Sequence, residues 1–197
     1  MTGAKRGFTL MELLVVMGLF SVTVMMASSI FMLSNRAQRR VLAVTSAQAD
    51  LRYALEAIVR EARMGRIDYA SYAGSGGAVS VPTNRLILKG PTGSEEEFYL
   101  ETSPTVCPAN VAKCIAMTVN GSAPQALTST GINIDILAFY ISPQSDPFAA
   151  DPGSGLYASN LQPTVTVAVQ ARTVGIGASD VLTVNAETTA ASRLYER

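Results

Sequence analysis

A long apolar run near the N-terminus constrains the fold of this chain more than any other feature. The 26 residues from Phe8 to Leu33 carry a single charge, that of Glu12. A helix needs about 20 apolar residues to cross the hydrocarbon core of a bilayer. We therefore expect residues 8–33 to form a membrane-spanning helix, preceded by a short polar segment, residues 1–7, that places Lys5 and Arg6 at its edge.

A cleaved secretory signal is the first alternative for this run. The segment Met26-Ala27-Ser28-Ser29 resembles a small-residue cleavage site. The apolar part of a secretory signal is typically about 7–15 residues long, which is shorter than the run found here. The length therefore favours a segment that stays in the membrane.

The composition excludes several kinds of chemistry. The chain has 197 residues, of which 48% are hydrophobic and 15% charged, and it contains no His. Catalytic triads that use His, and most transition-metal sites, are therefore ruled out. Lys+Arg and Asp+Glu both number 15, so no basic excess is present to bind nucleic-acid phosphates.

Glu12 stands in the sequence Gly7-Phe8-Thr9-Leu10-Met11-Glu12. An ionisable residue inside a membrane span is costly and indicates a function. A basic leader that ends in Gly, followed by Phe-Thr-Leu-x-Glu and an apolar helix, resembles the signature of the type IV prepilin family. This family includes the minor pilins and the pseudopilins of type II secretion.

The resemblance implies a maturation step and an assembly role. A prepilin peptidase would remove residues 1–7 by cutting after Gly7, and would methylate the new terminus at Phe8. Glu12 would then neutralise the terminal amine of a neighbouring subunit in a filament. A carboxylate in hydrocarbon costs several kcal/mol unless it is paired, which supports that role. A shallow position of Glu12 in the membrane interface is the alternative.

The charges flanking the apolar run do not agree with the orientation that the resemblance implies. Lys5 and Arg6 precede the run, whereas Arg36, Arg39 and Arg40 follow it. A positive-inside count would place the C-terminal side in the cytoplasm. The resemblance implies the opposite: a single-pass protein of the bacterial inner membrane with an extracytoplasmic head, which then enters a pilus or pseudopilus at or near its tip.

Residues 34–64 predict that the helix continues beyond the membrane, from about Thr9 to Met64. The segment contains no Pro and no Gly, and Gly65 follows as an expected C-cap. Glu56 and Arg60 are spaced for an i,i+4 ion pair. Apolar residues recur at steps of three and four, which indicates an amphipathic helix: Val44, Ala47, Leu51, Ala54, Leu55, Ile58 and Ala62.

Residues 65–197 predict a β-rich globular head. Segments of alternating or apolar residues are bounded by turn residues. The expected class is α+β and pilin-like, with one long helix packed on a mostly antiparallel sheet. The expected strands are Arg85–Lys89, a hairpin partner at Glu97–Glu101, Lys113–Val119, Ile132–Ile141, Thr164–Arg172 and Asp180–Thr188, with a turn at Gly74–Gly77.

Two further features of the head concern stability and metals. Cys107 and Cys114 enclose six residues, and an oxidising exterior favours a disulfide between them over two free thiols. Acidic residues cluster at Glu95–Glu97 and at Asp146 with Asp151. Neither cluster has a recognisable calcium-ligand spacing, so a solvated acidic turn is the favoured interpretation. We expect no cofactor and no metal.

Residues 51–63 also resemble the first head segment of J-type pseudopilins and W-type minor pilins. The resemblance implies a minor pilin or pseudopilin that helps to initiate, prime or cap a pilus or a type II secretion pseudopilus. The implied partners are other major and minor pilins, the prepilin peptidase, the inner-membrane assembly platform and, before assembly, membrane lipid.

Two other functions remain open on the same residues. The first is a filament-tip adhesin or a DNA-uptake pilin on the same scaffold, although the head has more acidic than basic residues and we expect no nucleic acid. The second is a membrane-anchored extracytoplasmic enzyme. Neither a Gly-x-Ser-x-Gly nor a Ser-x-x-Lys motif occurs, so we expect no enzymatic activity.

Overall fold

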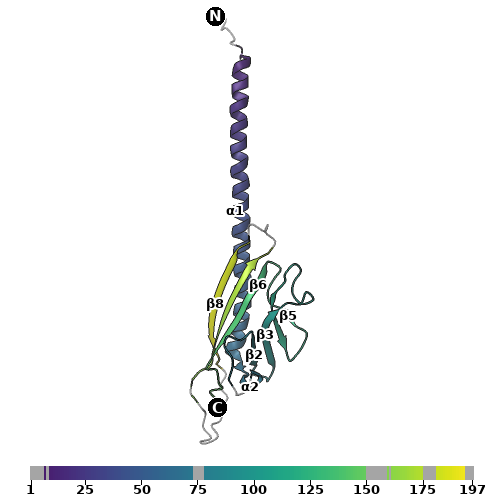
Figure 1. Cartoon of the computed structure of the whole chain (residues 1–197), viewed down its shortest axis with the longest axis vertical. Helices are drawn as coiled ribbons and strands as arrows, with labels where there is room; N and C mark the ends of the chain where they lie inside the picture. Colours follow the sequence, from purple (N-terminus) through teal and green to yellow (C-terminus); the bar gives the residue numbers. More distant parts are fainter. Residues whose placement is uncertain are drawn as a thin grey trace. The chain divides into compact units, whose positions relative to one another are not determined.

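The computed structural model describes residues 7, 9–72, 78–149, 159, 161–174 and 181–193. The chain divides into two compact units, Met1–Leu42 and Ala43–Arg197. Helix α1 extends from Leu10 to Met64, so the boundary between the units falls inside it (Figure 1). The two units are described one after the other.

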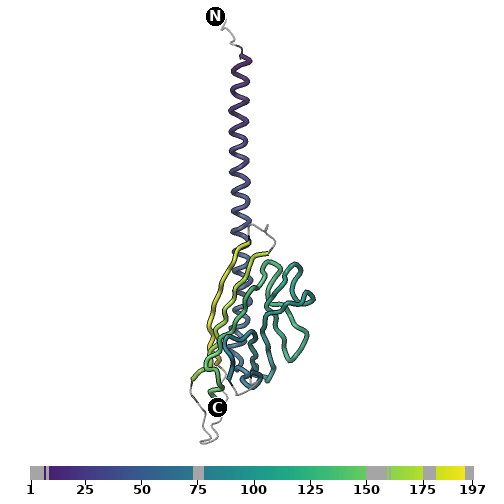
Figure 2. Tube along the Cα trace, viewed as in Figure 1, coloured from purple at the N-terminus to yellow at the C-terminus, as the bar shows by residue number. Residues whose placement is uncertain are grey.

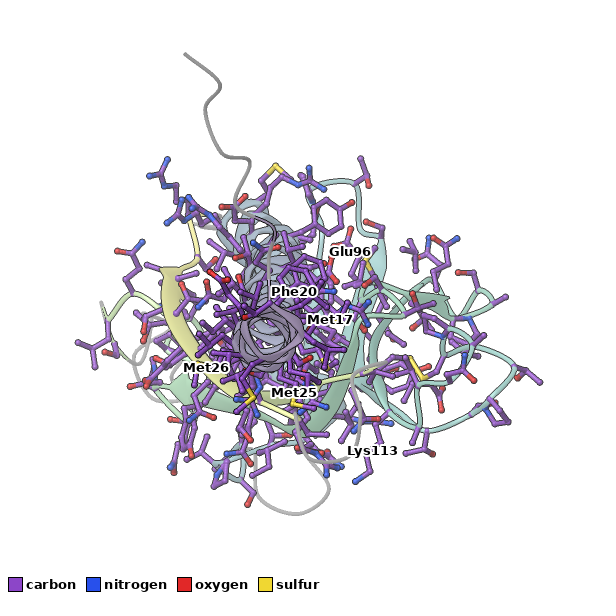
Figure 3. The ribbon with its side chains drawn as sticks, turned by 90° about the horizontal axis from the view of Figure 1, so that it is seen from above. Met17, Phe20, Met25, Met26, Glu96 and Lys113 are labelled. Atoms are coloured by element: carbon purple, nitrogen blue, oxygen red, sulfur yellow. A yellow bond between two sulfur atoms is a disulfide. The ribbon has the colours of Figure 1, made fainter. Side chains whose placement is uncertain are left out.

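In the first unit α1 is apolar on all sides. Every residue from Leu10 to Ser34 is exposed, and the helix is long and apolar enough to cross a membrane by length and composition. Figure 3 looks along α1 and shows Met17, Phe20, Met25 and Met26 projecting on different sides of it. A helix that is hydrophobic all round requires an apolar environment, either lipid or other helices.

In the second unit α1 buries one apolar face. Six of the seven residues predicted for the amphipathic stripe are buried, whereas Val44 is only partly buried. Leu51, Ala54 and Ile58 have relative exposures of 1% or less, so the face packs tightly against the strands. The buried residues follow the helical period: Ala47, Leu51, Ala54, Leu55, Ile58 and Ala62.

The first sheet has five antiparallel strands in the order β1-β2-β3-β4-β5. The hairpin expected across residues 90–93 is confirmed: β2 pairs with β3, and Leu86 lies opposite Phe98. Gly93 in the turn has a φ of 82°, a conformation that favours glycine. The strands are β1 (Arg66–Ile67), β2 (Arg85–Lys89), β3 (Glu95–Glu101), β4 (Cys114–Val119) and β5 (Gln125–Ala126).

The second sheet has three antiparallel strands in the order β6-β7-β8. They are β6 (Ile132–Ser142), β7 (Thr164–Thr173) and β8 (Thr183–Ala191). Figure 2 shows the three strands, green to yellow, beside the part of α1 that belongs to the same unit. Their inward residues join the α1 stripe and the inner face of the first sheet in one core, which includes Phe98, Phe139, Ile141 and Val167.

The head therefore has two sheets where the sequence predicted one. Hydrogen bonds link the start of β6 to the segment just before β4, but they do not form a strand ladder. The Asn133 Oδ1 accepts from the backbone N–H groups of Ala112 and Lys113, and the Ile134 N–H donates to the Lys113 carbonyl. Among the described strands, β6 forms a ladder with β7 alone, and an isolated bridge joins its Phe139 to Thr83, before β2.

The alternation predicted for β6 also breaks at one point. The pairing register with β7 shifts between Ile134 and Ile136, which is a β-bulge at Asp135. Ile132 and Ile134 are buried, but Ile136 is 53% exposed, and the buried positions resume at Leu137. The extra residue exchanges the inward and outward faces of the strand after the bulge. The unbroken alternation in the sequence predicted an inward Ile136, which is therefore wrong.

Gly65 follows the last residue of α1, as the sequence predicted, but it does not adopt the left-handed conformation common at such positions. Its N–H donates to the Glu61 carbonyl at 2.7 Å, and Gly65 is absent from the described residues with positive φ. A Cβ at this position would lie 3.0 Å from the Lys89 carbonyl oxygen and 3.1 Å from that of Glu61. Glycine therefore allows the close approach of α1 to β2.

Candidate processing and assembly site

The site begins with the cap of α1. The backbone N–H of Glu12 donates to the Thr9 carbonyl at 3.1 Å and to the Thr9 hydroxyl oxygen at 3.3 Å. Thr9 is therefore the N-cap, and Glu12 occupies the third helical position. Thr-x-x-Glu is the capping-box pattern, so sequence reasoning could have found the role of Thr9 but did not.

Glu12 combines a favourable backbone position with an unfavourable environment. In the first turn of α1 its carboxylate lies near the positive end of the helix dipole. Its neighbours on the helix are apolar and exposed, among them Leu10 at 80%, Met11 at 74% and Leu13 at 55%. In lipid or in a helix bundle, such a carboxylate would require a cation or hydrogen-bond donor from another molecule.

Among the described residues, none makes a contact that explains why position 7 is glycine. It is exposed, and a Cβ built on it meets nothing within 4 Å. The contrast with Gly65, where a Cβ would touch two backbone carbonyls, is direct. Lys5, Arg6 and Phe8, also predicted for this site, lie outside the described residues.

The predicted disulfide between Cys107 and Cys114 is present. Cys114 is the first residue of β4, and Cys107 lies in the loop that follows β3. Both are buried with Val111 in a small cluster, against which Ala126 of β5 packs. The bridge therefore holds the β3–β4 connection against the edge of the first sheet.

The acidic cluster Glu95–Glu97 lies on a strand, which corrects the predicted acidic turn. All three residues belong to β3, between β2 and β4, and Glu97 pairs with Arg85 of β2 at 3.1 Å. β3 begins two residues before the predicted start because Glu95 and Glu96 pair with β2, opposite Lys89 and Leu88.

The two acidic clusters do not form a metal site among the described residues. Asp146 accepts a hydrogen bond from the Phe148 N–H at 2.9 Å, and Asp151 lies outside the described residues. No group of three or more His, Cys, Asp or Glu side chains converges in the described part of the chain. No described cluster therefore offers a set of calcium ligands.

Ion pairs on α1 differ from the predicted Glu56–Arg60 pair. Glu56 pairs with Arg52, one turn earlier, at 2.8 Å, and Arg60 pairs with Glu61 at 3.0 Å. Arg60 also acts on Glu96 of β3, whose carboxyl lies close to that of Glu61. Because the carboxyl groups of Glu61 and Glu96 attract Arg60, Glu56 pairs with Arg52 instead.

A groove of about 630 Å³ lies between α1 and β8 within the second unit. Its apolar lining includes Leu51, Leu55 and Val184. Its charged lining includes Arg52 and Glu56, which form the ion pair described above and so neutralise each other. Among its described lining residues, no nucleophile is paired with a base.

The fold and the site together define a class. A long helix, apolar in its first part and amphipathic in its second, packs on antiparallel sheets, which is a pilin-like α+β fold. Residues 3–28 match the family model described as the prokaryotic N-terminal methylation motif. The N-terminal part of the chain therefore carries a prepilin-type signal. Comparisons with curated proteins and with solved structures found no match.

The methylation motif covers the whole of the candidate site. It includes the expected cleavage position after Gly7, the cap residue Thr9 and Glu12. The motif implies processing by a prepilin peptidase and assembly with other pilins. It also agrees with a path from the inner membrane into a filament.

Proposed function

We propose that this protein is a minor pilin or pseudopilin that helps to initiate, prime or cap a type IV pilus or a type II secretion pseudopilus. The observation that carries the proposal is the placement of Glu12. It is an exposed carboxylate in the first turn of a helix that is otherwise apolar and exposed up to Ser34. A second pilin helix would supply both the apolar cover and the cation that this surface requires.

The size of the head supports a minor role over a repeating one. The second unit, Ala43–Arg197, contains two sheets and forms most of the chain. A bulky head packs poorly in a dense filament, where every subunit repeats the same contacts. A subunit present once or a few times, at an end, avoids that restriction.

The charges of the head argue against DNA uptake through it. Residues 65–197 contain seven basic and eleven acidic residues. Three of the basic side chains pair with carboxylates: Arg85 with Glu97, Lys89 with Asp68, and Arg172 with Asp135. Basic groups that are already paired are poor ligands for phosphates, so binding to other pilins is the favoured function.

The test is an intact-mass measurement of the membrane-extracted protein, made in cells that contain its own peptidase. The proposal expects a mass that lacks residues 1–7 and includes one added methyl group. Gly7→Leu should block this maturation while membrane insertion continues, because a Cβ at position 7 meets no described residue within 4 Å. An uncleaved mass, or cleavage near Ser28, would show that the N-terminus is a simple anchor or export signal.

A further inference from the structure

We propose that Arg36 and Arg39, with Arg40 beside them, bind the phosphate groups of anionic phospholipids in the outer leaflet of the membrane. This inference rests on the proposed function, which holds the apolar run in the membrane before assembly. The proposal gives a ligand to the three arginines that make the positive-inside count disagree with an extracytoplasmic head. The assembly role of Glu12 does not explain these arginines.

The helix places these arginines at headgroup depth. α1 continues without a break from the apolar run through residue 40. Arg36 is three residues beyond Leu33 and Arg40 is seven, which correspond to about 4.5 and about 10.5 Å of helical rise. The headgroup layer on each side of the hydrocarbon core is roughly 5–8 Å thick. Flexible arginine side chains extend along the helix and reach that layer from either position.

The arginines also share one face and are accessible. Residues three and four apart on a helix are neighbours, so Arg36 adjoins both Arg39 and Arg40. All three are exposed. The sequence contains no Asp or Glu between Glu12 and Asp50, so no carboxylate on this stretch of helix lies beside Arg36 or Arg39. The result is a concentrated positive patch directly after the membrane span.

The residue type favours phosphate. The guanidinium group is planar and always charged, and it binds phosphate oxygens through two parallel N–H donors. A phospholipid headgroup is the first source of phosphate that a helix meets as it leaves the hydrocarbon. An acidic surface of a neighbouring subunit is a different ligand, which the experiment below separates from lipid.

The test measures lipid selectivity with the full chain reconstituted in phosphatidylcholine vesicles. Trace spin-labelled phosphatidylglycerol or phosphatidylcholine is added, and electron paramagnetic resonance gives the relative association of each label with the protein. We expect phosphatidylglycerol to associate about fivefold more strongly at about 0.1 M salt, the effect of roughly one arginine at a charged lipid surface. The double variant R36Q/R39Q should reduce this preference toward parity.

A matched control removes the same charge elsewhere on the same helix. Arg52 and Arg60 lie about 28 and about 40 Å of helical rise beyond Leu33. That distance is several Debye lengths at about 0.1 M salt, so R52Q/R60Q should keep the lipid preference. A preference that is lost equally in both double variants would contradict a local site and overturn the proposal.

The remaining outcomes separate the lipid proposal from the function on which it rests. Resistance to carbonate extraction shows that the chain spans the vesicle membrane. An inserted chain with no preference for phosphatidylglycerol would overturn the lipid proposal alone. If R36Q/R39Q then also impaired filament incorporation, the arginines would bind a neighbouring subunit and not lipid. A chain that carbonate extracts would overturn both proposals.

Discussion

The hydroxyl of Ser192 donates a hydrogen bond of 2.7 Å to the carbonyl oxygen of Gly65, and both residues are buried. The next residue, Arg193, donates its N–H to the Arg63 carbonyl at 3.1 Å. The last carbonyls of a helix have no partners within it. The segment after β8 therefore caps the end of α1, and joins the first and last described elements of the head.

Replacing Ser192 by Ala should destabilise the head by about 1–3 kcal/mol, because it leaves a buried carbonyl oxygen without its donor. Denaturant unfolding of the full chain in detergent, followed by circular dichroism, measures the change. Ser80→Ala is the matched control, since Ser80 is exposed. Equal stability of the two variants would show that the Ser192 hydrogen bond does not hold the end of α1.

Gly65→Ala should also destabilise the head, for a steric reason. The new Cβ would lie 3.0 and 3.1 Å from the carbonyl oxygens of Lys89 and Glu61, and neither backbone group can move freely. We expect a cost of roughly 1–3 kcal/mol in the same unfolding measurement. Gly18→Ala is the control, because a Cβ there meets nothing within 4 Å. If both variants unfolded at the parent concentration of denaturant, the close approach of α1 to β2 would be refuted.

The sequence predicted the long elements well because their patterns are long. Helix α1 was expected from about Thr9 to Met64 and extends from Leu10 to Met64. Strands β2, β3, β4, β6 and β7 lie where apolar or alternating segments predicted them, with ends that differ by a few residues. β8 begins at Thr183, three residues after the predicted start. The bounds of β8 are set by its pairing with β7, and the local sequence pattern carries no information on that pairing.

The short elements were missed because tertiary contacts create them. β1 has two residues, β5 two and α2 (Tyr69–Tyr72) four, so each covers only about one period of its pattern and no repeat can be recognised. Side chains anchor α2 from distant segments: the Tyr69 hydroxyl donates to the Pro143 carbonyl at 2.9 Å. The Tyr72 hydroxyl accepts from the Ile87 N–H. Sequence reasoning has no access to such contacts between residues far apart in the chain.

The candidate site was the more predictable part. The motif around Glu12 is local, so its residues and their spacing can be read directly from the chain. The structure adds the cap at Thr9, and it shows that a Cβ at Gly7 would meet no described residue within 4 Å. The Asp135 bulge and the split into two sheets depend on pairing, and the sequence carries no equally local signal for them.

Glu96→Gln should stabilise the head at neutral pH. Burial raises the pKa of the Glu96 carboxyl, the nearby Glu61 carboxyl raises it further, and Arg60 partly offsets both effects. A raised pKa means that folding favours the protonated form, so this contribution to stability is present below the unfolded pKa and is lost as the pH rises through the folded value. Gln resembles the protonated form and should remove the cost of the charge.

The expected gain at pH 7 is a few tenths to about 1 kcal/mol, because solvent screens this partly exposed group. Unfolding midpoints at pH 7 and pH 4 measure it, and the gain should shrink at pH 4. Glu187→Gln, at an exposed position of β8, is the control. A larger gain at pH 4 than at pH 7 would reverse the sign of the argument.

Reduction of the Cys107–Cys114 bridge should destabilise the head. In the entropic model, a bridge that closes a loop this short reduces the conformational entropy of the unfolded chain and so stabilises the fold by roughly 2–3 kcal/mol. Unfolding of the parent chain with and without reductant measures the loss. The double variant C107S/C114S should have the stability of the reduced parent chain, both with and without reductant. A further fall of that variant on adding reductant would place the effect elsewhere than in this bridge.

Glu12→Val should separate processing from assembly. The cleavage site at Gly7 is untouched, so the intact mass should still show loss of residues 1–7 and one methyl group. Incorporation should fall at least about tenfold, because the terminal amine of the neighbouring subunit then lacks its carboxylate partner in an apolar environment. The measurement is the fraction of the chain found in sheared filaments, made with the cognate machinery present.

Leu14→Val is the matched control, since it changes an exposed side chain in the same helical segment without removing a charge. It should be cleaved and incorporated like the parent chain. If Glu12→Val assembled at the parent level, charge pairing would not be required for assembly. The cap of α1 should remain in this variant, because the N–H bonds from position 12 to Thr9 do not depend on the side chain. Loss of cleavage in Glu12→Val would instead show that the peptidase recognises the carboxylate.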